Sequence, residues 1–347
     1  MPLWQLTTPE TQATGAPWFS VKAMTVDAHL DLAHNALDLG RDLTLSLGEL
    51  RKIDSRADIP TVTIPALCDG NVAVVFGTLW VDPKKFTDPE SAHKHALKQL
   101  DVYRRWQDQG LIRLVDSREG LEAHLSRWQQ DRVPGLIVLI EGAEPIRTPE
   151  EVSFWRNQGV RLVALAWTKS RYAGGTGNPG GLTELGGELL QAMTDSNMAL
   201  DTSHLAEQSF WEALEIWKGP VSASHSNPRT LVPTDRHLTD EMIAELGKRN
   251  GVIGIVPFNK FLQPGWERGQ ARLSLDVPKK HLEYLANRVG WDKVGIGSDM
   301  DGGFGLNELP AGLDEPRDLI KVVQGAPLEA RELVLGENWL RWLRSWL

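Results

Sequence analysis

The sequence predicts a (β/α)8 barrel, the TIM-like arrangement of the α/β class. Two observations support it. Short, continuously apolar runs rich in β-branched residues recur along the chain, as expected for strands buried on both faces of a parallel sheet. Amphipathic helical patterns fill the intervals between these runs, and this alternation is typical of barrels and of doubly wound sheets. The open, doubly wound sheet is therefore the alternative.

Eight runs are predicted to be strands, which is the number that a closed barrel needs. They are residues 24–31, 71–80, 135–142, 160–168, 197–204, 220–227, 251–258 and 293–302.

The helices between them are predicted from start and stop signals. The segment 148–159 begins with Thr148 and a proline, has Glu151 in place for a capping box, and ends at a glycine. Similar patterns cover residues 203–219, 239–251 and 276–290.

The chain is expected to form one domain over residues 1–347, since we find no repeat, low-complexity tract or linker that would divide it. At its end, Trp339, Trp342, Leu343, Trp346 and Leu347 fall on one helical face. We expect this face to pack against the barrel or a second subunit, and membrane-surface binding is the weaker alternative.

Composition limits the partners. The net charge of -9 argues against a nucleic-acid ligand, which would need a basic face. The single cysteine, Cys68, can supply neither an intrachain disulfide nor a thiolate cluster. No apolar stretch is long enough to span a membrane, and residues 1–18 lack the pattern of a signal peptide. We therefore expect a cytoplasmic protein.

Metal-ligand residue types gather at the carboxyl ends of the predicted strands, where barrel enzymes carry their chemistry. These residues are His29, Asp31, Glu141, His204, His225 and Asp299. His29 and Asp31 are two residues apart on one strand, so their side chains point to the same side.

Six imidazole and carboxylate groups exceed what one tetrahedral ion can use. A two-metal site with one bridging carboxylate accommodates them. Such ions make hydroxide available near neutral pH, so hydrolysis of a carbonyl compound is the predicted reaction class.

Three motifs then give a resemblance to a known family. They are GLTELGGELLQAMTDSNMALDTSH (181–204), VSASHSNPR (221–229) and GIGSDMDG (295–302). With them the chain resembles the membrane (renal) dipeptidases, peptidase family M19, within the amidohydrolase-like metallohydrolases.

The resemblance implies a zinc-dependent dipeptidase that cleaves dipeptides through a metal-bridging hydroxide. It implies two zinc ions, Zn²⁺, with His29 and Asp31 on the first and Glu141 bridging to the second. His204 and His225 complete the ligand set of the second ion.

The resemblance also implies roles outside the ligand set. In the family pattern Asp299 is the acid/base residue, and Arg236 binds the carboxylate of a dipeptide-like substrate. Asp301, two residues further along, is a competitor for the acid/base role on its position alone. Family members usually form dimers, so a homodimer is possible.

One position departs from the family pattern. Trp167 stands where the family usually has a histidine that contacts the scissile carbonyl. Trp167 is expected to line the substrate pocket and to change its substrate range. The alternatives are therefore a metallohydrolase for another small amide or lactone, such as a β-lactam or modified dipeptide, and a catalytically silent metal-binding barrel.

Residues 175–180, GTGNPG, are expected to form a flexible loop at the barrel mouth. The remaining histidines are expected at the surface, and they are His34, His93, His95, His124 and His281.

Overall fold

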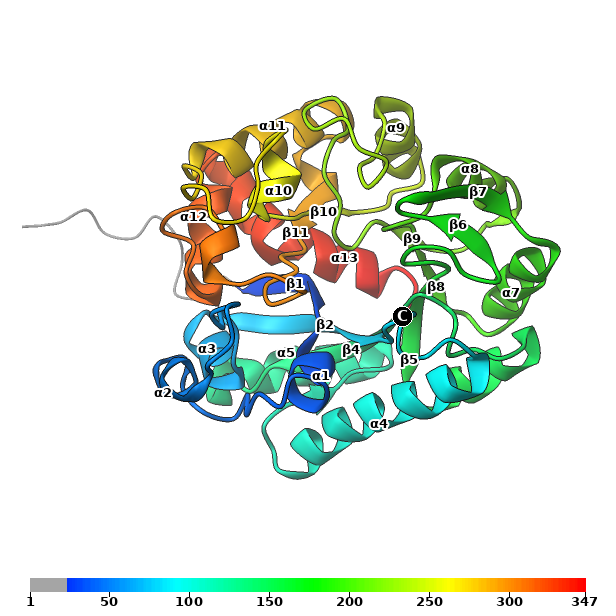
Figure 1. Cartoon of the computed structure of the whole chain (residues 1–347), viewed down its shortest axis with the longest axis horizontal. Coiled ribbons are helices and arrows are strands. Elements are labelled where there is room, and N and C mark those ends of the chain that lie inside the picture. The colour runs from blue at the N-terminus through cyan, green and yellow to red at the C-terminus, as the bar shows by residue number, and fades with distance from the viewer. Residues whose placement is uncertain (1–23) are drawn as a thin grey trace, which may run out of the picture.

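A computed structural model describes residues 24–347, and its centre is a parallel β-barrel (Figure 1). The strand order is β10-β11-β1-β2-β4-β5-β8-β9, and a parallel bridge between Ala223 and Ile253 joins the last strand to the first. The predicted barrel is confirmed, and the open doubly wound sheet is wrong for this chain.

All eight predicted strands are present, several of them shorter than expected. They are β1 (Thr25–Leu30), β2 (Val72–Trp80), β4 (Gly135–Glu141), β5 (Val160–Ala164), β8 (Ala199–Asp201), β9 (Val221–Ser222), β10 (Ile253–Ile255) and β11 (Val294–Ile296). Two features were not predicted. A short strand β3 (Arg113–Leu114) pairs with β4, and the GTGNPG segment belongs to an antiparallel hairpin of β6 (Ala173–Gly175) and β7 (Asn178–Leu182).

Helices surround the barrel on its outer side (Figure 1). They are α1 (Leu32–Leu37), α2 (Leu47–Ile53), α3 (Ile64–Asp69), α4 (Pro89–Asp108), α5 (Arg118–Asp131), α6 (Val152–Asn157), α7 (Glu184–Asp195), α8 (Glu207–Ile216), α9 (Asp240–Lys248), α10 (Asn259–Leu262), α11 (Asp276–Val289), α12 (Leu319–Val323) and α13 (Asn338–Arg344).

The four predicted helical segments contain helices α6, α8, α9 and α11, although α8 begins four residues later than predicted. Thr239 caps α9 through the backbone N–H of Met242, as predicted. The capping box predicted at Thr148 is wrong. Glu151 instead accepts a hydrogen bond from the backbone N–H of Arg147, and the short 3₁₀ turn at Pro149–Glu151 has no side-chain cap.

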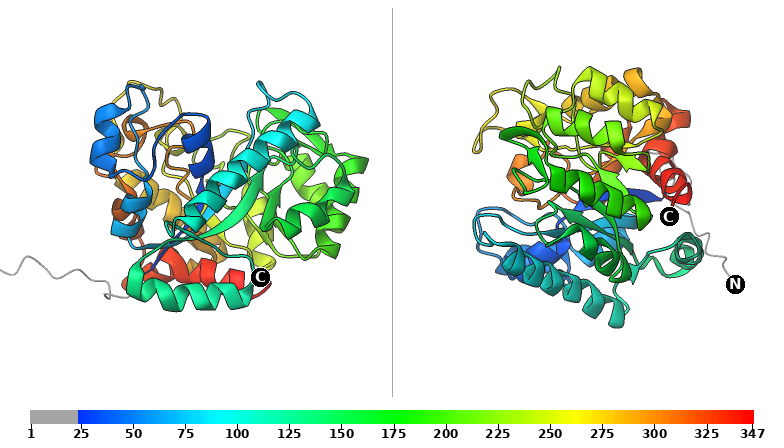
Figure 2. Two further views of the ribbon diagram at one scale, coloured as in Figure 1. Left: turned by 90° about the horizontal axis from the view of Figure 1, so that it is seen from below. Right: turned by 90° about the vertical axis from the view of Figure 1, so that its right-hand side faces the viewer.

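The C-terminal helix α13 packs against the barrel, as its apolar face predicted. Trp339 contacts the ring of Phe76 in β2, with 5.2 Å between ring centroids, and its indole N–H donates to the carbonyl of Ile296. Figure 2 shows α13 beside α5, and Arg344 forms an ion pair with Glu122 of that helix at 2.6 Å. Trp339, Trp342 and Leu343 are thus buried within the molecule, and Trp346 and Leu347 are partly buried against the same core.

The surface prediction for the remaining histidines is wrong for four of them. His93, His95, His124 and His281 are all buried, since each is at most 8% exposed. The prediction assumed that a polar residue lies on the exposed face of its helix. A histidine can lie on the buried face when a backbone carbonyl accepts a hydrogen bond from its ring. His124 and His281 contact the carbonyls of Ala73 and Leu262.

Burial of His281 predicts a pH-dependent contribution to stability. Burial lowers its pKa to about 4 from an ordinary 6.5, so between these values the unfolded chain binds a proton that the folded chain does not. The free energy of unfolding therefore falls as the pH is lowered through this window. We expect His281→Gln to remove about 2–3 kcal/mol of the difference in stability between pH 7 and pH 4.5.

Denaturant unfolding of both proteins at the two pH values measures this difference. Equal losses of stability in wild type and variant would contradict the assignment.

Candidate metal centre

The predicted ligand residues converge at the carboxyl ends of the strands. His29 is the penultimate residue of β1, Asp31 directly follows that strand, and Glu141 ends β4. His204 and His225 follow β8 and β9. All five are at most 9% exposed, so the barrel has placed polar groups from four strands in one buried volume.

Glu141 is the centre of this arrangement. Its Oε2 lies 3.2 Å from Nε2 of His29, while its Oε1 lies 3.2 Å from Nε2 of His204 and 3.5 Å from Nε2 of His225. The two oxygens of one carboxylate thus face imidazoles on opposite sides, which is the geometry of a bridging ligand. Asp31 adds a second carboxylate to the His29 side, at 3.9 Å from Nε2 of His29.

The charge balance fits cation binding. Burial lowers the pKa of His204 to about 4 and that of His225 well below its ordinary value, so both imidazoles are neutral near pH 7. Their Nε2 atoms nevertheless lie only 3.0 Å apart. Two groups with nitrogen lone pairs so close together, beside a carboxylate, form a donor set for a metal ion.

His29 gives the same indication from the other side of Glu141. Its Nε2 is buried without a hydrogen-bond partner among the described residues. Burial acts to lower its pKa, but the carboxylates of Glu141, Asp299 and Asp31 raise it to about 10. Negative charge therefore surrounds Nε2 of His29, an atom suited to metal ligation. The five ligand-type residues together fit two cations, with Glu141 between them.

Two site residues adopt a left-handed backbone. His204 has φ +68° and Asp299 has φ +55°, in a region that non-glycine residues seldom adopt. Gly302 makes room for Asp299, because a Cβ atom there would lie 1.8 Å from Oδ1 of Asp299. The strand-end turns thus accept local strain and place both side chains at the barrel mouth.

Asp299 and Asp301 have different surroundings. Asp299 lines the cavity, and burial together with the charges of Asp31 and Glu141 raises its pKa well above the ordinary value, although His29 and Arg236 oppose this. The Asp301 carboxylate instead accepts hydrogen bonds from the backbone N–H groups of Thr61 and Val62 and from the Thr61 hydroxyl. Asp301 therefore anchors a loop, which leaves Asp299 as the carboxyl group facing the cavity.

Arg236 is buried beside the cavity. Its guanidinium donates to the carbonyl of His225 at 2.7 Å and lies over the Phe261 ring, with its carbon 5.3 Å from the ring centroid. The Nε–H has no partner among the described residues. One donor therefore remains for an acceptor that the protein itself does not supply.

A cavity of about 370 Å³ opens above the carboxylates. Asp31, Glu141, His204 and Asp299 contribute its polar wall. Its remaining lining is mainly aromatic and comprises Trp80, Trp167, Phe258, Phe261 and Phe304, with His34 and Gly302–Gly303. Trp167 lies edge-on to Trp80 at 5.3 Å and 5.9 Å from the His204 ring, so it lines the pocket as expected.

The sequence reasoning missed His34. It lines the cavity from α1, lies edge-on to Trp80 at 4.8 Å, and has its Nδ1 held by Asp38 at 3.1 Å. The available signal was its spacing, since a residue three positions after Asp31 in a helix lies on the same face.

Comparison with known proteins agrees with this geometry. A family model, "Membrane dipeptidase (Peptidase family M19)", matches residues 18–345. The chain belongs to this family. It is therefore a metallo-dipeptidase by family, which confirms the resemblance found in the sequence motifs.

Individual relatives are distant. An uncharacterized protein in the pqqA 5' region of Klebsiella pneumoniae is 31% identical over 265 residues, which cover 72% of this chain and 93% of the relative. Dipeptidase tcpJ of Claviceps purpurea is 26% identical, covering 82% of this chain and 69% of the relative.

Solved structures share the fold. A metallopeptidase of family M19 named dipeptidase AC superimposes with a TM-score of 0.80 at 23% identity, covering 94% of this chain and 99% of its own. A metallopeptidase from Rhodobacter sphaeroides, solved with a phosphinate mimic of the dipeptide L-Ala-D-Ala, gives 0.78 at 22% identity, covering 93% of this chain and 99% of its own.

Within residues 24–347, no helix combines the length and the apolar character that crossing a bilayer requires. The single-domain boundary at 1–347, the cytoplasmic location and the homodimer stay predictions.

Proposed function

We propose that this protein is a dinuclear zinc dipeptidase whose two ions share Glu141. The observation that carries the proposal is the position of the Glu141 carboxylate, with one oxygen toward His29 and the other toward His204 and His225. His29 and Asp31 would hold the first ion, and His204 and His225 the second. Bound zinc would lower the pKa of a bridging water enough to make hydroxide available near neutral pH, and would polarise the substrate carbonyl.

The chain's own residues supply the remaining steps. Asp299 would accept the proton of the attacking water on a carboxylate oxygen and donate it to the nitrogen of the departing amine. Its position in the cavity wall supports this role, because the same carboxyl group can then reach both the attacking water and the departing amine. The unpartnered Nε–H of Arg236 would donate to the carboxylate of the substrate.

The aromatic lining of the cavity indicates which dipeptide side chains it would accept. Trp80 ends β2 and Trp167 lies in the segment after β5, while Phe258 and Phe304 follow β10 and β11. In the strand order these pairs stand across the barrel mouth from one another. Two facing apolar walls would bury large side chains, so we propose dipeptides that contain aromatic or bulky aliphatic residues as the preferred substrates.

Hydrolysis of a panel of L–L and L–D dipeptides by zinc-loaded protein, followed by amine release, tests the proposal. We expect turnover that a chelator abolishes and that added zinc restores. Two bound zinc ions with no turnover on any dipeptide would favour the alternative, another small amide or lactone substrate. That alternative draws its support from Trp167 at the usual histidine position.

Trp167 should control the size of the accepted side chain. Trp167→His provides a hydrogen-bond donor near the scissile carbonyl and opens one wall. We expect kcat for Ala–Ala to rise by about 10²-fold, in line with the contribution of one oxyanion donor. The KM for Phe-containing dipeptides should rise about tenfold, because the indole contact is lost.

Steady-state kinetics on both substrates measure these changes. Trp167→Phe, which keeps an aromatic wall without adding a donor of this kind, is the matched control. Unchanged hydrolysis of both substrates by Trp167→His would show that this position does not set the substrate range.

A further inference from the structure

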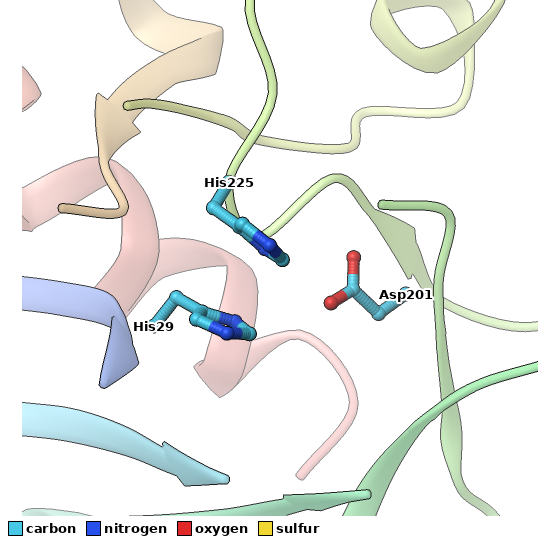
Figure 3. A group of neighbouring side chains, drawn as sticks. All are labelled: His29, Asp201 and His225. Carbon is cyan, nitrogen blue, oxygen red and sulfur yellow. The ribbon is translucent and has the colours of Figure 1, made fainter. Parts of the chain in front are cut away.

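A third group of ligand-type residues lies beside the proposed zinc site. His29, Asp201 and His225 each offer a ligand atom within 4.8 Å of the other two, and Figure 3 shows their side chains facing one another. All three are buried. By residue type alone this cluster resembles another cation site.

The hydroxyl of Ser224 contacts all three of these side chains. Its Oγ lies 3.2 Å from Nδ1 of His29, 2.8 Å from Nδ1 of His225 and 2.5 Å from Oδ2 of Asp201. A fourth contact, at 3.3 Å, is to the hydroxyl of Ser203. The cluster is therefore joined through a protein side chain, and a cation there would have to displace it.

The direction of these hydrogen bonds follows from Asp201. Its Oδ1 already accepts the backbone N–H groups of Ser224 at 2.9 Å and Ser203 at 3.1 Å, which fixes the carboxylate as an acceptor. The Ser224 hydroxyl has one proton and two lone pairs. It donates the proton to Oδ2 of Asp201, so its two lone pairs accept from the two imidazoles, which lie nearer at 2.8 Å and 3.2 Å than the Ser203 hydroxyl at 3.3 Å.

This direction fixes the ring nitrogens. When Nδ1 of His29 and Nδ1 of His225 both carry a proton, each ring presents Nε2 as its ligand atom. These are the nitrogens that face Glu141, at 3.2 Å and 3.5 Å from its two oxygens. One hydroxyl thus orients a ligand on each side of the bridging carboxylate.

We propose that Ser224, held by Asp201, is a positioning residue that fixes His29 and His225 as Nε2 ligands and thereby couples the two metal sites. The effect of Ser224 on zinc binding rests on the proposed function, since it requires that the two zinc ions bind at this site. The hydrogen-bond arrangement itself belongs to the metal-free chain as well. Groups that orient metal-bound histidines usually contribute about 10- to 100-fold to metal affinity.

Cobalt titration of the chelator-stripped protein, followed by visible absorption and by metal analysis after gel filtration, is the first test. Wild type should bind two equivalents. Ser224→Ala should bind both 10- to 100-fold more weakly, and Ser224→Thr, which keeps the hydroxyl, should restore part of the loss. Ser226→Ala is the matched control, because Ser226 lies at the same strand end but contacts Ser203 and Arg236 instead. It should bind cobalt as wild type does.

The ¹⁵N-histidine NMR spectrum of the metal-free protein is the second readout, and it does not depend on zinc. We expect two protected Nδ1–H signals with contacts to the Ser224 Cβ protons, and their loss in Ser224→Ala. Asp201→Asn, whose amide can donate to the hydroxyl and reverse its direction, should weaken the same two signals and provides a second variant if Ser224→Ala does not fold.

The outcomes separate the two proposals. Failure of wild type to bind metal while both Nδ1–H signals are present would overturn the zinc site but support the role of Ser224. Wild-type cobalt affinity and unchanged Nδ1–H signals in folded Ser224→Ala would overturn the role of Ser224. A third equivalent of cobalt that disappears in Asp201→Asn would also overturn it, since the cluster would then be a cation site.

Discussion

Replacing Glu141 by glutamine is expected to reduce bound zinc from two equivalents to one or fewer and to lower kcat/KM by at least about 10³-fold. The glutamine side chain has the same shape, but its NH₂ group cannot coordinate an ion, so one side of the bridge is lost. The negative charge that faces His29, His204 and His225 is lost as well. Metal analysis after dialysis and dipeptide kinetics measure the two effects.

Glu144→Gln is the matched control. Glu144 lies three residues further along the same loop and is part-buried against Arg171 at 3.0 Å, away from the histidines. We expect it to keep both zinc ions and nearly full activity. If Glu141→Gln, shown to be folded by circular dichroism, also kept both ions and its activity, the bridging assignment would be untenable.

Replacing Asp299 by asparagine is expected to lower kcat by about 10²–10⁴-fold while leaving two zinc ions bound. Asparagine preserves the shape of the side chain, but its amide can neither take a proton from water nor deliver one to the leaving amine. Unchanged metal content would separate this effect from that of Glu141→Gln. Single-turnover kinetics and metal analysis on the same preparation provide the measurement.

Asp301→Asn distinguishes the two neighbouring aspartates. The Asp301 carboxylate holds the backbone of Thr61 and Val62, and Arg41 lies 3.8 Å from it. Its replacement should lower the free energy of unfolding by about 1–3 kcal/mol because buried donors lose a partner. Its kcat should stay within a few-fold of wild type. The opposite pattern, with kcat lost in Asp301→Asn and retained in Asp299→Asn, would transfer the proton-transfer role to Asp301.

These two variants also bear on the catalytically silent alternative. A barrel that only binds metal and ligand has no use for a proton-transfer group at the cavity wall. Indistinguishable behaviour of Asp299→Asn and wild type in every hydrolytic assay would favour that alternative.

The fold could be predicted from the sequence because a parallel barrel has a simple pattern of apolar strands separated by amphipathic helices. Strands buried on both faces are continuously apolar, and the eight runs from residue 24 to residue 302 could be recognised individually. The hairpin at β6 and β7 could not. The second strand, β7, is NPGGL, whose proline and glycines do not form the alternating apolar pattern of a strand. Contacts with other segments hold the hairpin in place, such as the hydrogen bond from the Gly174 N–H in β6 to the Ser209 hydroxyl.

Much of the candidate site was also predictable. His29, Glu141 and His204 could be predicted to lie together because the carboxyl ends of barrel strands meet at one mouth, and their side chains do converge there. His34 and Phe304 were not predicted to line the cavity, because each lies several residues after a strand end. Their positions at the cavity depend on how helix α1 and the loop after β11 run back over the barrel.

The sequence by itself thus determined the barrel, the family and the residue types that gather at its mouth, since these depend on local periodicity and on motifs. Only the tertiary structure decided which oxygen of Glu141 faces which histidine, that Asp301 anchors a loop while Asp299 faces the cavity, and that Ser224 joins His29 to His225. The physical reason is that hydrogen bonds are directional and short, so they depend on the positions of atoms from distant segments, which closure of the barrel sets.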